Sequence, residues 1–413
     1  MSKPQNKIEH SHELHKESRR SFIGKLLFKD DQPPVLVCIF LRGGADTLNM
    51  FVPYEDADYY RLRPSLAIKP PRGSDKSCAI AVGDDLAFHP ALAPLVPLYK
   101  DGLMAIVDSV GSDNQSGSHF EAQDQIEHGV SSLKPGITGG GWLGRHLLCS
   151  AERYRSPLAA VAMAASLPEA LRGAPAASAI TSLSGLELKV PGDAHFDADA
   201  VAQDLSRLYG ADCGILGESG KNTVELLGRM KKLSLLDKPG QGSGYPSGRL
   251  GTSLSEIARL IKANVGLEVA CVDHGGWDTH FFQGTEQGLQ AGNIDELAKS
   301  LAAFHNEVGG DVTVLVYTEF GRRIYENGSL GTDHGRGFSL FALGSKIKGG
   351  RHGSRPPLKD EKDFELGPSG LPISIDYRSV LAEIVGGVLN NHRLDRVFPQ
   401  FQPQSVGLVD CRS

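Results

Sequence analysis

Residues Val35–Pro53 read VLVCIFLRGGADTLNMFVP, and this stretch determines the fold that we expect. The seven mostly apolar residues Val35–Leu41 are too few to cross a membrane and too unbroken for an exposed strand, so they predict a buried central strand. A flexible Gly43–Gly44 turn follows, and then Asp46. Ligands of open parallel sheets bind beyond the carboxyl ends of the strands. Asp46 is therefore either a ligand of a metal or polar substrate, or the cap of a turn.

Four further apolar stretches predict strands, and amphipathic stretches between them predict helices. The strands are expected at 103–107, 267–272, 312–318 and 338–343, and the helices at 88–102, 121–129, 254–265, 293–308 and 377–389. This alternation is typical of an α/β domain with a mostly parallel central sheet flanked by helices, which we expect over residues 35–413. Residues 151–250, which include Ala-rich, Gly-rich and Pro-rich stretches, form either a cap inserted over the sheet or peripheral helices of the same domain.

Composition and charge argue against several classes of function. The chain has 413 residues, and its 43 Lys and Arg against 49 Asp and Glu give a net charge of -6. Without a basic excess to neutralise phosphates, we expect no nucleic-acid partner. No apolar run approaches the roughly 18 to 20 residues of a membrane helix, so we expect no transmembrane segment. The six scattered cysteines form no CxxC pair and predict mostly buried thiols in a reducing compartment.

Residues 1–34 are polar and rich in His, Lys and Glu, as a flexible arm is. They include SRRSFI at 18–23, which is similar to a twin-arginine export signal. Such a signal requires an uncharged apolar region next, but residues 24–30 read GKLLFKD. We therefore interpret the motif as degenerate and expect a cytoplasmic protein; a functional motif would instead place the protein in the periplasm.

Ser118 lies at the end of a polar loop, close to the start of the helix expected at 121–129. The free N–H groups and the dipole of a helix N-terminus favour an oxyanion and lower the cost of ionising a serine hydroxyl. Ser118 is therefore a candidate nucleophile, with an ordinary N-cap as the alternative.

Acidic and imidazole groups follow several of the expected strands. We interpret them as candidate metal ligands: Asp46, Asp278, His280, Glu319, Asp333 and His334. A parallel sheet brings the carboxyl ends of its strands to one edge, so these distant residues can form one pocket. Oxygen and nitrogen ligands suit Zn²⁺, Mn²⁺, Mg²⁺ or Ca²⁺ rather than a thiophilic ion, and we expect one or two ions.

Six motifs resemble the signature motifs of a bacterial family, domain-of-unknown-function family 1501. They are LRGGADTLN (41–49), SHFEAQD (118–124), GWLGR (141–145), VDHGGWDTH (272–280), TEFGRR (318–323) and GTDHGRG (331–337). The resemblance extends from about Val35 to the C-terminus. The family is in turn similar to the alkaline phosphatase and sulfatase superfamily, which implies an alkaline phosphatase-like fold.

The resemblance also implies roles for individual residues. Asp46, Asp278, His280 and His334 resemble metal ligands of that superfamily, and Ser118 resembles its nucleophile. The chain departs from the superfamily at Glu319-Phe320, where many members have Asp-His. A phenylalanine cannot bind a metal, so one of two metal sites would be weakened unless Asp333 or a nearby residue compensates. In an alternative register, Asp333-His334 is itself the Asp-His pair.

The implied activity is metal-dependent hydrolysis of a phosphate or sulfate ester of a small molecule or carbohydrate, with a serine or water nucleophile. Arg322 is a candidate catalytic residue because guanidinium geometry matches these anions, and the candidates for substrate contact are Arg42, Asn49, His119 and Arg336. Two alternatives remain open. One is a non-catalytic metal- or carbohydrate-binding protein, and the other is a phosphomutase-type transferase.

Overall fold

The computed structural model describes residues 33–131, 139–150, 156–183, 198–211, 214–234, 244–358 and 369–409. The chain divides into two units, and all the elements described below belong to the second, Pro34–Ser413. The polar arm with its twin-arginine-like motif lies outside the described residues, except for its last two positions. Four cysteines of the described part, Cys38, Cys78, Cys149 and Cys271, are free thiols.

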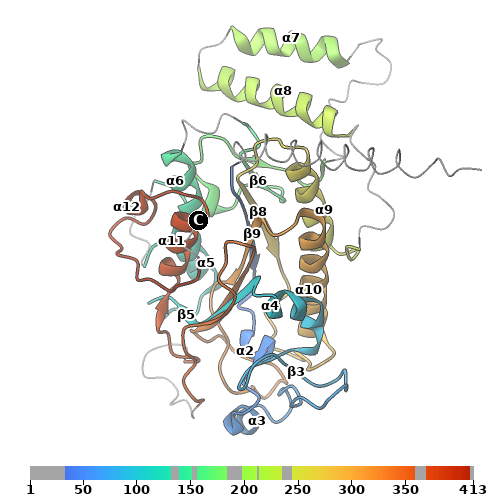
Figure 1. The fold of residues 1–413 in the computed structure, drawn as a ribbon. Helices are drawn as coiled ribbons and strands as arrows, with labels where there is room; N and C mark the ends of the chain where they lie inside the picture. The colour runs from blue at the N-terminus through green and yellow to red at the C-terminus, as the bar shows by residue number, and fades with distance from the viewer. Residues whose placement is uncertain are drawn as a thin grey trace, which may run out of the picture. The chain divides into compact units, whose positions relative to one another are not determined.

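A central mixed sheet organises the described residues, with its strands in the order β11-β5-β10-β9-β1-β8-β6-β7 and β12 paired with β5 (Figure 1). The strands are β1 (Val35–Leu41), β5 (Met104–Gly111), β6 (Ala160–Ala162), β7 (Ser178–Ala179), β8 (Val269–His274), β9 (Val312–Thr318), β10 (Phe338–Leu343), β11 (Gly350–His352) and β12 (Ile375–Asp376). The first predicted strand, β1, is central and runs parallel to both β8 and β9. Only the strand predicted at 338–343, β10, is antiparallel to its neighbours β5 and β9, so the prediction of a mostly parallel sheet is confirmed.

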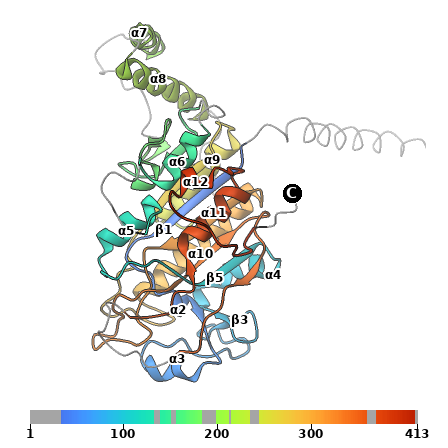
Figure 2. The ribbon, with the colours of Figure 1, turned by 90° about the vertical axis from the view of Figure 1, so that its left-hand side faces the viewer.

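The side chains of β1 alternate between two cores, as the period of a strand requires. One series, from Val37 to Leu41, faces the core that includes α9 (Arg249–Lys262) and α10 (Leu289–Val308). The other, from Leu36 to Phe40, faces the core that includes α6 (Trp142–Cys149), α11 (Tyr377–Gly387) and α12 (Leu394–Val397). Figure 2 shows this second face, with α6, α11 and α12 in front of β1. The sheet is therefore covered by helices on both sides, as predicted.

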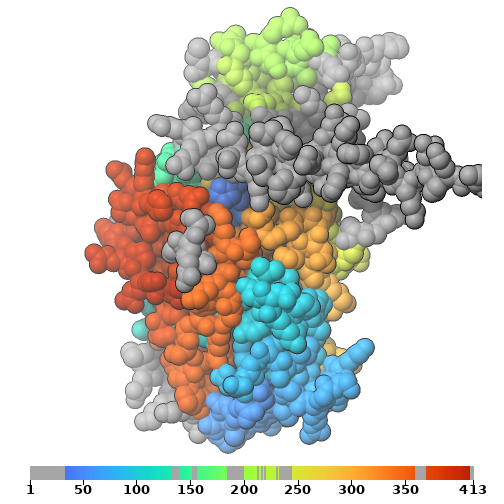
Figure 3. Space-filling view, in the orientation of Figure 1, coloured from blue at the N-terminus to red at the C-terminus, as the bar shows by residue number. Residues whose placement is uncertain are grey.

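The remaining elements are short or lie outside the central sheet. They are α2 (Thr47–Met50), β2 (Phe51–Val52), α3 (Ala57–Leu62), β3 (Ile80–Ala81), β4 (Ala87–Phe88), η1 (Pro90–Leu95), α4 (Val96–Lys100), α5 (His119–His128), η2 (Glu169–Leu171), α7 (Ala198–Gly210) and α8 (Ile215–Ser234). The strands β2, β4 and β3 form a small second sheet. Figure 3 shows the early segments from α2 to α4, in blue to cyan, directly beside the orange segments that follow residue 300.

Several element boundaries differ from the prediction. The helix expected at 88–102 is a 3₁₀ turn, η1, followed by the short helix α4, because Pro94 and Pro97 lack the amide hydrogens of a continuous helix. The strand expected at 103–107 continues to Gly111 through Asp108, a buried carboxylate. The arginines Arg351 and Arg355 neutralise this carboxylate from later in the chain.

The described part of residues 151–250 contributes both to the central sheet and to a pair of helices. Their strands β6 and β7 extend the central sheet beyond β8, while α7 and α8 pack against each other. Within the described residues, no helix is long and apolar enough to cross a membrane.

The Gly43–Gly44 turn at the end of β1 brings three segments into close contact. Both glycines have positive φ, at 122° for Gly43 and 64° for Gly44. A Cβ atom on Gly43 would lie 2.5 Å from the backbone nitrogen of Asp278, and one on Gly44 would lie 2.5 Å from the ring of Phe320. Only glycine therefore permits this approach.

We predict that Gly44→Ala lowers the free energy of unfolding by about 2 to 4 kcal/mol, because alanine is strained at this φ and its methyl group overlaps Phe320. Urea denaturation followed by circular dichroism measures the change. Gly292→Ala is the control: Gly292 lies in α10 with no atom near the added methyl group, so that substitution should stabilise the protein by roughly 0.5 to 1 kcal/mol. Equal effects of the two substitutions would contradict the proposed packing.

Candidate metal centre

The carboxyl ends of β1, β5, β8 and β9 lie at one edge of the sheet, together with the start of the antiparallel strand β10. Three segments at this edge supply imidazoles. His119 is the first residue of α5, which follows β5. His280 lies beyond the end of β8, and His334 precedes β10. The fold thus gathers residues that are up to 215 positions apart in the sequence, from His119 to His334.

The three imidazoles surround one carboxylate oxygen, Oδ1 of Asp278. This oxygen lies 3.1 Å from Nε2 of His280, 3.3 Å from Nε2 of His334 and 3.5 Å from Nε2 of His119. The Nε2 atoms of His280 and His334 are 2.9 Å apart. The ligand atoms of His119, Asp278 and His334 all lie within 4.8 Å of one another. The candidate ligand atoms of His119, Asp278 and His334 therefore form a compact set, and Nε2 of His280 lies beside the Oδ1 of Asp278.

The opposite ring nitrogen of each histidine contacts an oxygen. Nδ1 of His119 lies 2.8 Å from Oε1 of Glu319, and Nδ1 of His280 lies 2.9 Å from Oδ1 of Asp333. Nδ1 of His334 lies 2.8 Å from the carbonyl oxygen of Gly117. Because all three partners are hydrogen-bond acceptors, we assign the proton of each neutral ring to Nδ1. Each Nε2 then carries a lone pair directed toward Asp278.

This arrangement of lone pairs favours a positive charge at its centre. Without one, the two Nε2 lone pairs 2.9 Å apart would repel each other. The Nε2 atom of His119 is in addition buried and has no hydrogen-bond partner among the described residues. One extra proton could satisfy one pair of atoms, whereas a divalent cation satisfies all four. Imidazoles whose other nitrogen donates to a carboxylate or carbonyl are a general feature of protein metal sites, so these residues fit a metal ion.

Glu319 positions His119 rather than facing the convergence point. Its Oε1 also accepts hydrogen bonds from the backbone N–H of Gly43 at 2.9 Å and from Nε2 of Gln123 at 2.8 Å. Burial would raise the pKa of Glu319, but the hydrogen bonds from His119 and Gln123 lower it. In return, the hydrogen bond to Glu319 raises the pKa of His119.

Arg322 orients Asp278 from inside the protein. The guanidinium group donates to Oδ1 of Asp278 at 2.6 Å and to the backbone carbonyls of Gly44 and Thr332. Burial would raise the pKa of Asp278, but the hydrogen bond and charge of Arg322 outweigh it, so that this carboxyl stays ionised. Burial and the charge of Arg322 both lower the pKa of His334, which favours the neutral imidazole that a metal needs.

The ring of Phe320 packs against two imidazoles of the centre. Its ring centroid lies 4.9 Å from that of His119 and 4.8 Å from that of His334. From the sequence, we expected one of two metal sites to be weakened, because Phe320 stands where many superfamily members have a histidine. In the structure, the imidazole of His119 lies beside Phe320. The sequence signal for His119 was its position at a helix start beyond the second strand, which we assigned to substrate contact.

Residues 229–365 match the model of a family described as Protein of unknown function (DUF1501). This DUF1501 segment contains Asp278, His280 and His334, but not His119. The match agrees with the resemblance seen in the sequence motifs. No curated protein matches the chain.

Several solved structures have a similar fold. An alkaline phosphatase from the Antarctic bacterium TAB5 is 11% identical, with 90% of this chain and 100% of that chain covered and a TM-score of 0.30. The sulfatase PsFucS1 from Pseudoalteromonas sp. is 11% identical, with 96% and 75% covered and a TM-score of 0.35. A putative sulfatase from Bacteroides thetaiotaomicron is 9% identical, with 91% and 76% covered and a TM-score of 0.33.

Asp46 and Asn49 lie in a buried network that includes Arg63. Oδ2 of Asp46 is 2.6 Å from Nη1 of Arg63 and accepts a hydrogen bond from Gln283 at 2.7 Å. The side-chain oxygen of Asn49 accepts from Arg63 at 2.8 Å and from the hydroxyl of Tyr59. Asp46 thus neutralises a fully buried arginine, a partner that the sequence pattern did not indicate.

The other sequence candidates differ in how they face the centre. Ser118 is the N-cap residue of α5, but its hydroxyl makes no capping hydrogen bond. Arg42 forms ion pairs with Glu127 at 2.9 Å and Asp273 at 3.1 Å. Arg336 is half-buried, and its Nε is buried without a hydrogen-bond partner in the described part of the chain. Arg336 lines a small pocket with Gly117, Ala122, Ser112, Asn114, Glu319, Phe320 and Gly335.

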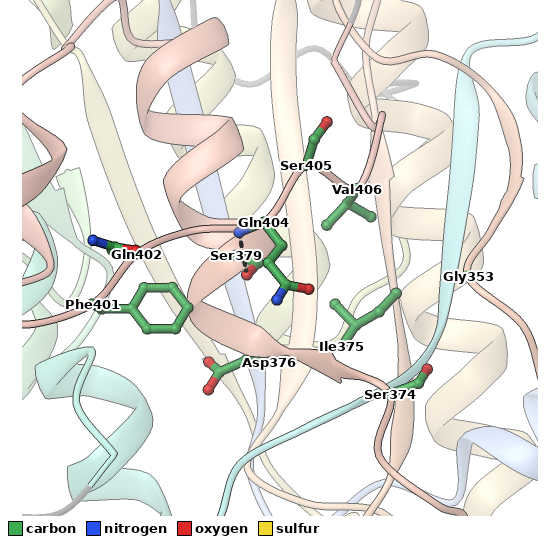
Figure 4. Close-up of a pocket in the computed structure, with 10 residues that line it drawn as sticks. All are labelled: Gly353, Ser374, Ile375, Asp376, Ser379, Phe401, Gln402, Gln404, Ser405 and Val406. Carbon is green, nitrogen blue, oxygen red and sulfur yellow. Dashed lines mark hydrogen bonds between the residues drawn. The ribbon is translucent and has the colours of Figure 1, made fainter.

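A second hollow, of about 440 Å³, lies beside α11 and the C-terminal segment (Figure 4). Serine and glutamine side chains line it together with Phe401 and Ile375. Among its described lining residues, Asp376 is the one carboxylate, and it is paired with Arg378 at 2.6 Å. This hollow therefore lacks the imidazoles that the centre at the sheet edge provides.

We predict that His119→Ala affects zinc affinity, whereas Asp46→Asn affects folding stability. His119→Ala should reduce zinc affinity by at least roughly 100-fold, because it removes a ligand. Asp46→Asn should leave zinc affinity near that of the wild type but lower the free energy of unfolding by about 3 kcal/mol, because Arg63 loses its buried countercharge. Isothermal titration with zinc and urea denaturation measure the two quantities. Loss of zinc only in Asp46→Asn would show that the assignment is wrong.

We also predict that Glu319→Gln weakens zinc binding roughly 10- to 100-fold, because His119 loses the carboxylate that fixes its tautomer. The matched control is Glu127→Gln. Glu127 is also buried, and burial raises its pKa to about 7, but it forms an ion pair with Arg42 rather than a contact with an imidazole. Competition titrations against a zinc indicator should therefore show a loss in Glu319→Gln alone, and equal losses in both variants would refute the role of Glu319.

Proposed function

We propose that this protein is a metal-dependent hydrolase of phosphate or sulfate esters. One observation carries the proposal, namely the convergence of three imidazole Nε2 atoms and Oδ1 of Asp278, with each Nδ1 bonded to an acceptor. Histidine nitrogens and a carboxylate oxygen are the ligand types of catalytic zinc sites, whereas structural zinc sites are built mainly from cysteine thiolates. The similarity of motifs to DUF1501 does not assign an activity, so the donor set is the main support.

The ligands would be His119, Asp278, His280 and His334. Their nitrogen-rich composition favours Zn²⁺ over Mg²⁺ or Ca²⁺, which prefer oxygen ligands, and their single point of convergence favours one ion. When bound there, a divalent ion supplies Lewis acidity, which lowers the pKa of water or a serine hydroxyl and balances charge on the ester oxygens.

The residues around the centre suit an anionic substrate. The buried Nε of Arg336 has no partner among the described residues, and Arg336 lines a pocket of about 10 Å³ with Phe320 and Glu319, so the guanidinium could donate to one oxygen of a phosphate or sulfate group. Arg322 has a different role, because its fully buried side chain donates to backbone carbonyls and to Asp278. We therefore propose Arg336 as the substrate contact and Arg322 as a positioning residue.

Ser118 and water are the two possible nucleophiles. Ser118 lies between Gly117, whose carbonyl fixes His334, and His119. The backbone N–H of Ser118 is already used, because it donates a hydrogen bond to the hydroxyl of Ser116 at 3.2 Å. Its hydroxyl makes no capping bond, and it stands at the N-terminus of α5, where an ionised oxygen is stabilised.

We predict that the zinc- or manganese-loaded protein hydrolyses an aryl phosphate or aryl sulfate, and that a chelator abolishes turnover until metal is restored. His334→Ala should reduce kcat/KM by at least roughly 100-fold, because it removes a ligand, while Asp376→Asn, at the second hollow, should not. A covalent ester intermediate, trapped in the wild type and absent in Ser118→Ala, would identify the serine as nucleophile. Unchanged turnover in Ser118→Ala would identify water.

Three other results would contradict the proposal. A folded, metal-loaded protein that turns over neither ester would favour the non-catalytic binding protein. Transfer of phosphate to a second alcohol without release of inorganic phosphate would favour a phosphomutase-type transferase. Turnover that persists without metal would exclude the centre as the site of reaction.

A further inference from the structure

Large apolar side chains are exposed directly beside the proposed ligands. Phe281 and Phe282 follow His280 and are 64% and 71% exposed. Leu330, four residues before His334, is 44% exposed. The ring centroid of Phe281 lies 6.4 Å from that of His280. We name Phe281, Phe282 and Leu330 the apolar lip.

The backbone of the apolar lip is held in an unfavourable conformation. Phe282 and Leu330 have positive φ, at 46° and 56°, which is a genuine outlier for bulky residues. The backbone N–H of Phe282 donates to the carbonyl of Ser329 at 3.1 Å, and that of Gln283 donates to the carbonyl of Leu330 at 2.9 Å. These two bonds join the two segments of the lip, so their side chains stay at the surface together.

Buried side chains anchor the lip from below. Gln283 is fully buried, and its Oε1 accepts from the hydroxyls of Thr279 at 2.8 Å and Thr332 at 2.7 Å. Asn327 donates to the carbonyl of His280 at 3.0 Å and to Oδ1 of Asp333 at 3.0 Å. The same contacts that position the histidines therefore also hold the lip, and strain kept at such a place indicates a functional constraint.

We propose that the apolar lip binds the apolar part of the substrate, so that the esters acted on carry an aromatic or alkyl group next to the anionic group. This inference rests on the proposed function. The metal and Arg336 would hold the anion, while the lip would cover the adjoining apolar surface and remove it from water. Continuity with the metal centre distinguishes the lip from exposed apolar residues elsewhere, such as Leu148 in α6, a helix with none of the proposed ligands.

The test compares two non-hydrolysable probes, phenylphosphonate and methylphosphonate, by isothermal titration into the zinc-loaded full-length protein. We expect the phenyl compound to bind at least about tenfold more tightly in the wild type. Phe281→Ser and Phe282→Asn should reduce this ratio to near one and leave methylphosphonate binding unchanged. Because asparagine tolerates positive φ, Phe282→Asn should keep or raise Tm, which excludes unfolding as the cause. Leu148→Asn is the control and should keep the full ratio.

The possible results separate the lip from the proposed function. A ratio that stays the same in the lip variants overturns the lip proposal while the hydrolase proposal stands. If neither phosphonate binds, the anion site fails, and the uncharged dye N-phenyl-1-naphthylamine then decides: fluorescence lost in the lip variants supports an apolar ligand site, and equal fluorescence overturns it. Sedimentation of the wild type, but not of the lip variants, with phosphatidylcholine vesicles would overturn a substrate role in favour of a membrane surface.

Discussion

The close approach at the Gly43–Gly44 turn is the constraint on which the candidate centre depends. With no side chains there, the backbone of Asp278 and the ring of Phe320 lie directly against the end of β1. The carbonyls of the turn then accept hydrogen bonds from Arg322, and the same guanidinium orients Asp278. The end of one buried strand thus fixes a ligand that lies more than 230 residues further along the chain.

Two of the acidic residues at the sheet edge bind histidines rather than face the centre, so the centre is rich in nitrogen although its motifs are rich in carboxylates. Glu319 and Asp333 each accept a hydrogen bond from the Nδ1 of a histidine, so these carboxylates act on the centre by making the imidazoles more basic. Direct coordination by these carboxylates would suit Mg²⁺ or Ca²⁺, whereas imidazoles made more basic by carboxylates suit Zn²⁺. The chemistry of the centre therefore follows from which atoms face inward rather than from the composition of the motifs.

The sequence predicted the sheet and its functional edge but not the role of each residue. Unbroken apolar runs identify buried strands from local information, and the topology of α/β sheets then places Asp278, His280 and His334 together. The partner of Asp46 could not be predicted, because Arg63 is buried against it by the packing of a separate small sheet and α3. His119 was a candidate for substrate contact, and only its distance from Asp278 indicates a possible metal ligand.

The buried network of Asp46 extends to the loops that carry the candidate ligands. Its Oδ2 accepts from Gln283, whose oxygen accepts from the hydroxyls of Thr279 and Thr332. These threonines flank His280 and Asp333 in the sequence. The buried ion pair of Asp46 with Arg63 thus fixes the two loops that carry a proposed ligand, its carboxylate partner and the apolar lip. Loss of this ion pair would consequently cost folding stability rather than a metal donor, because the loops that carry the donors keep other hydrogen bonds, such as those from Asn327 to the carbonyl of His280 and to Asp333.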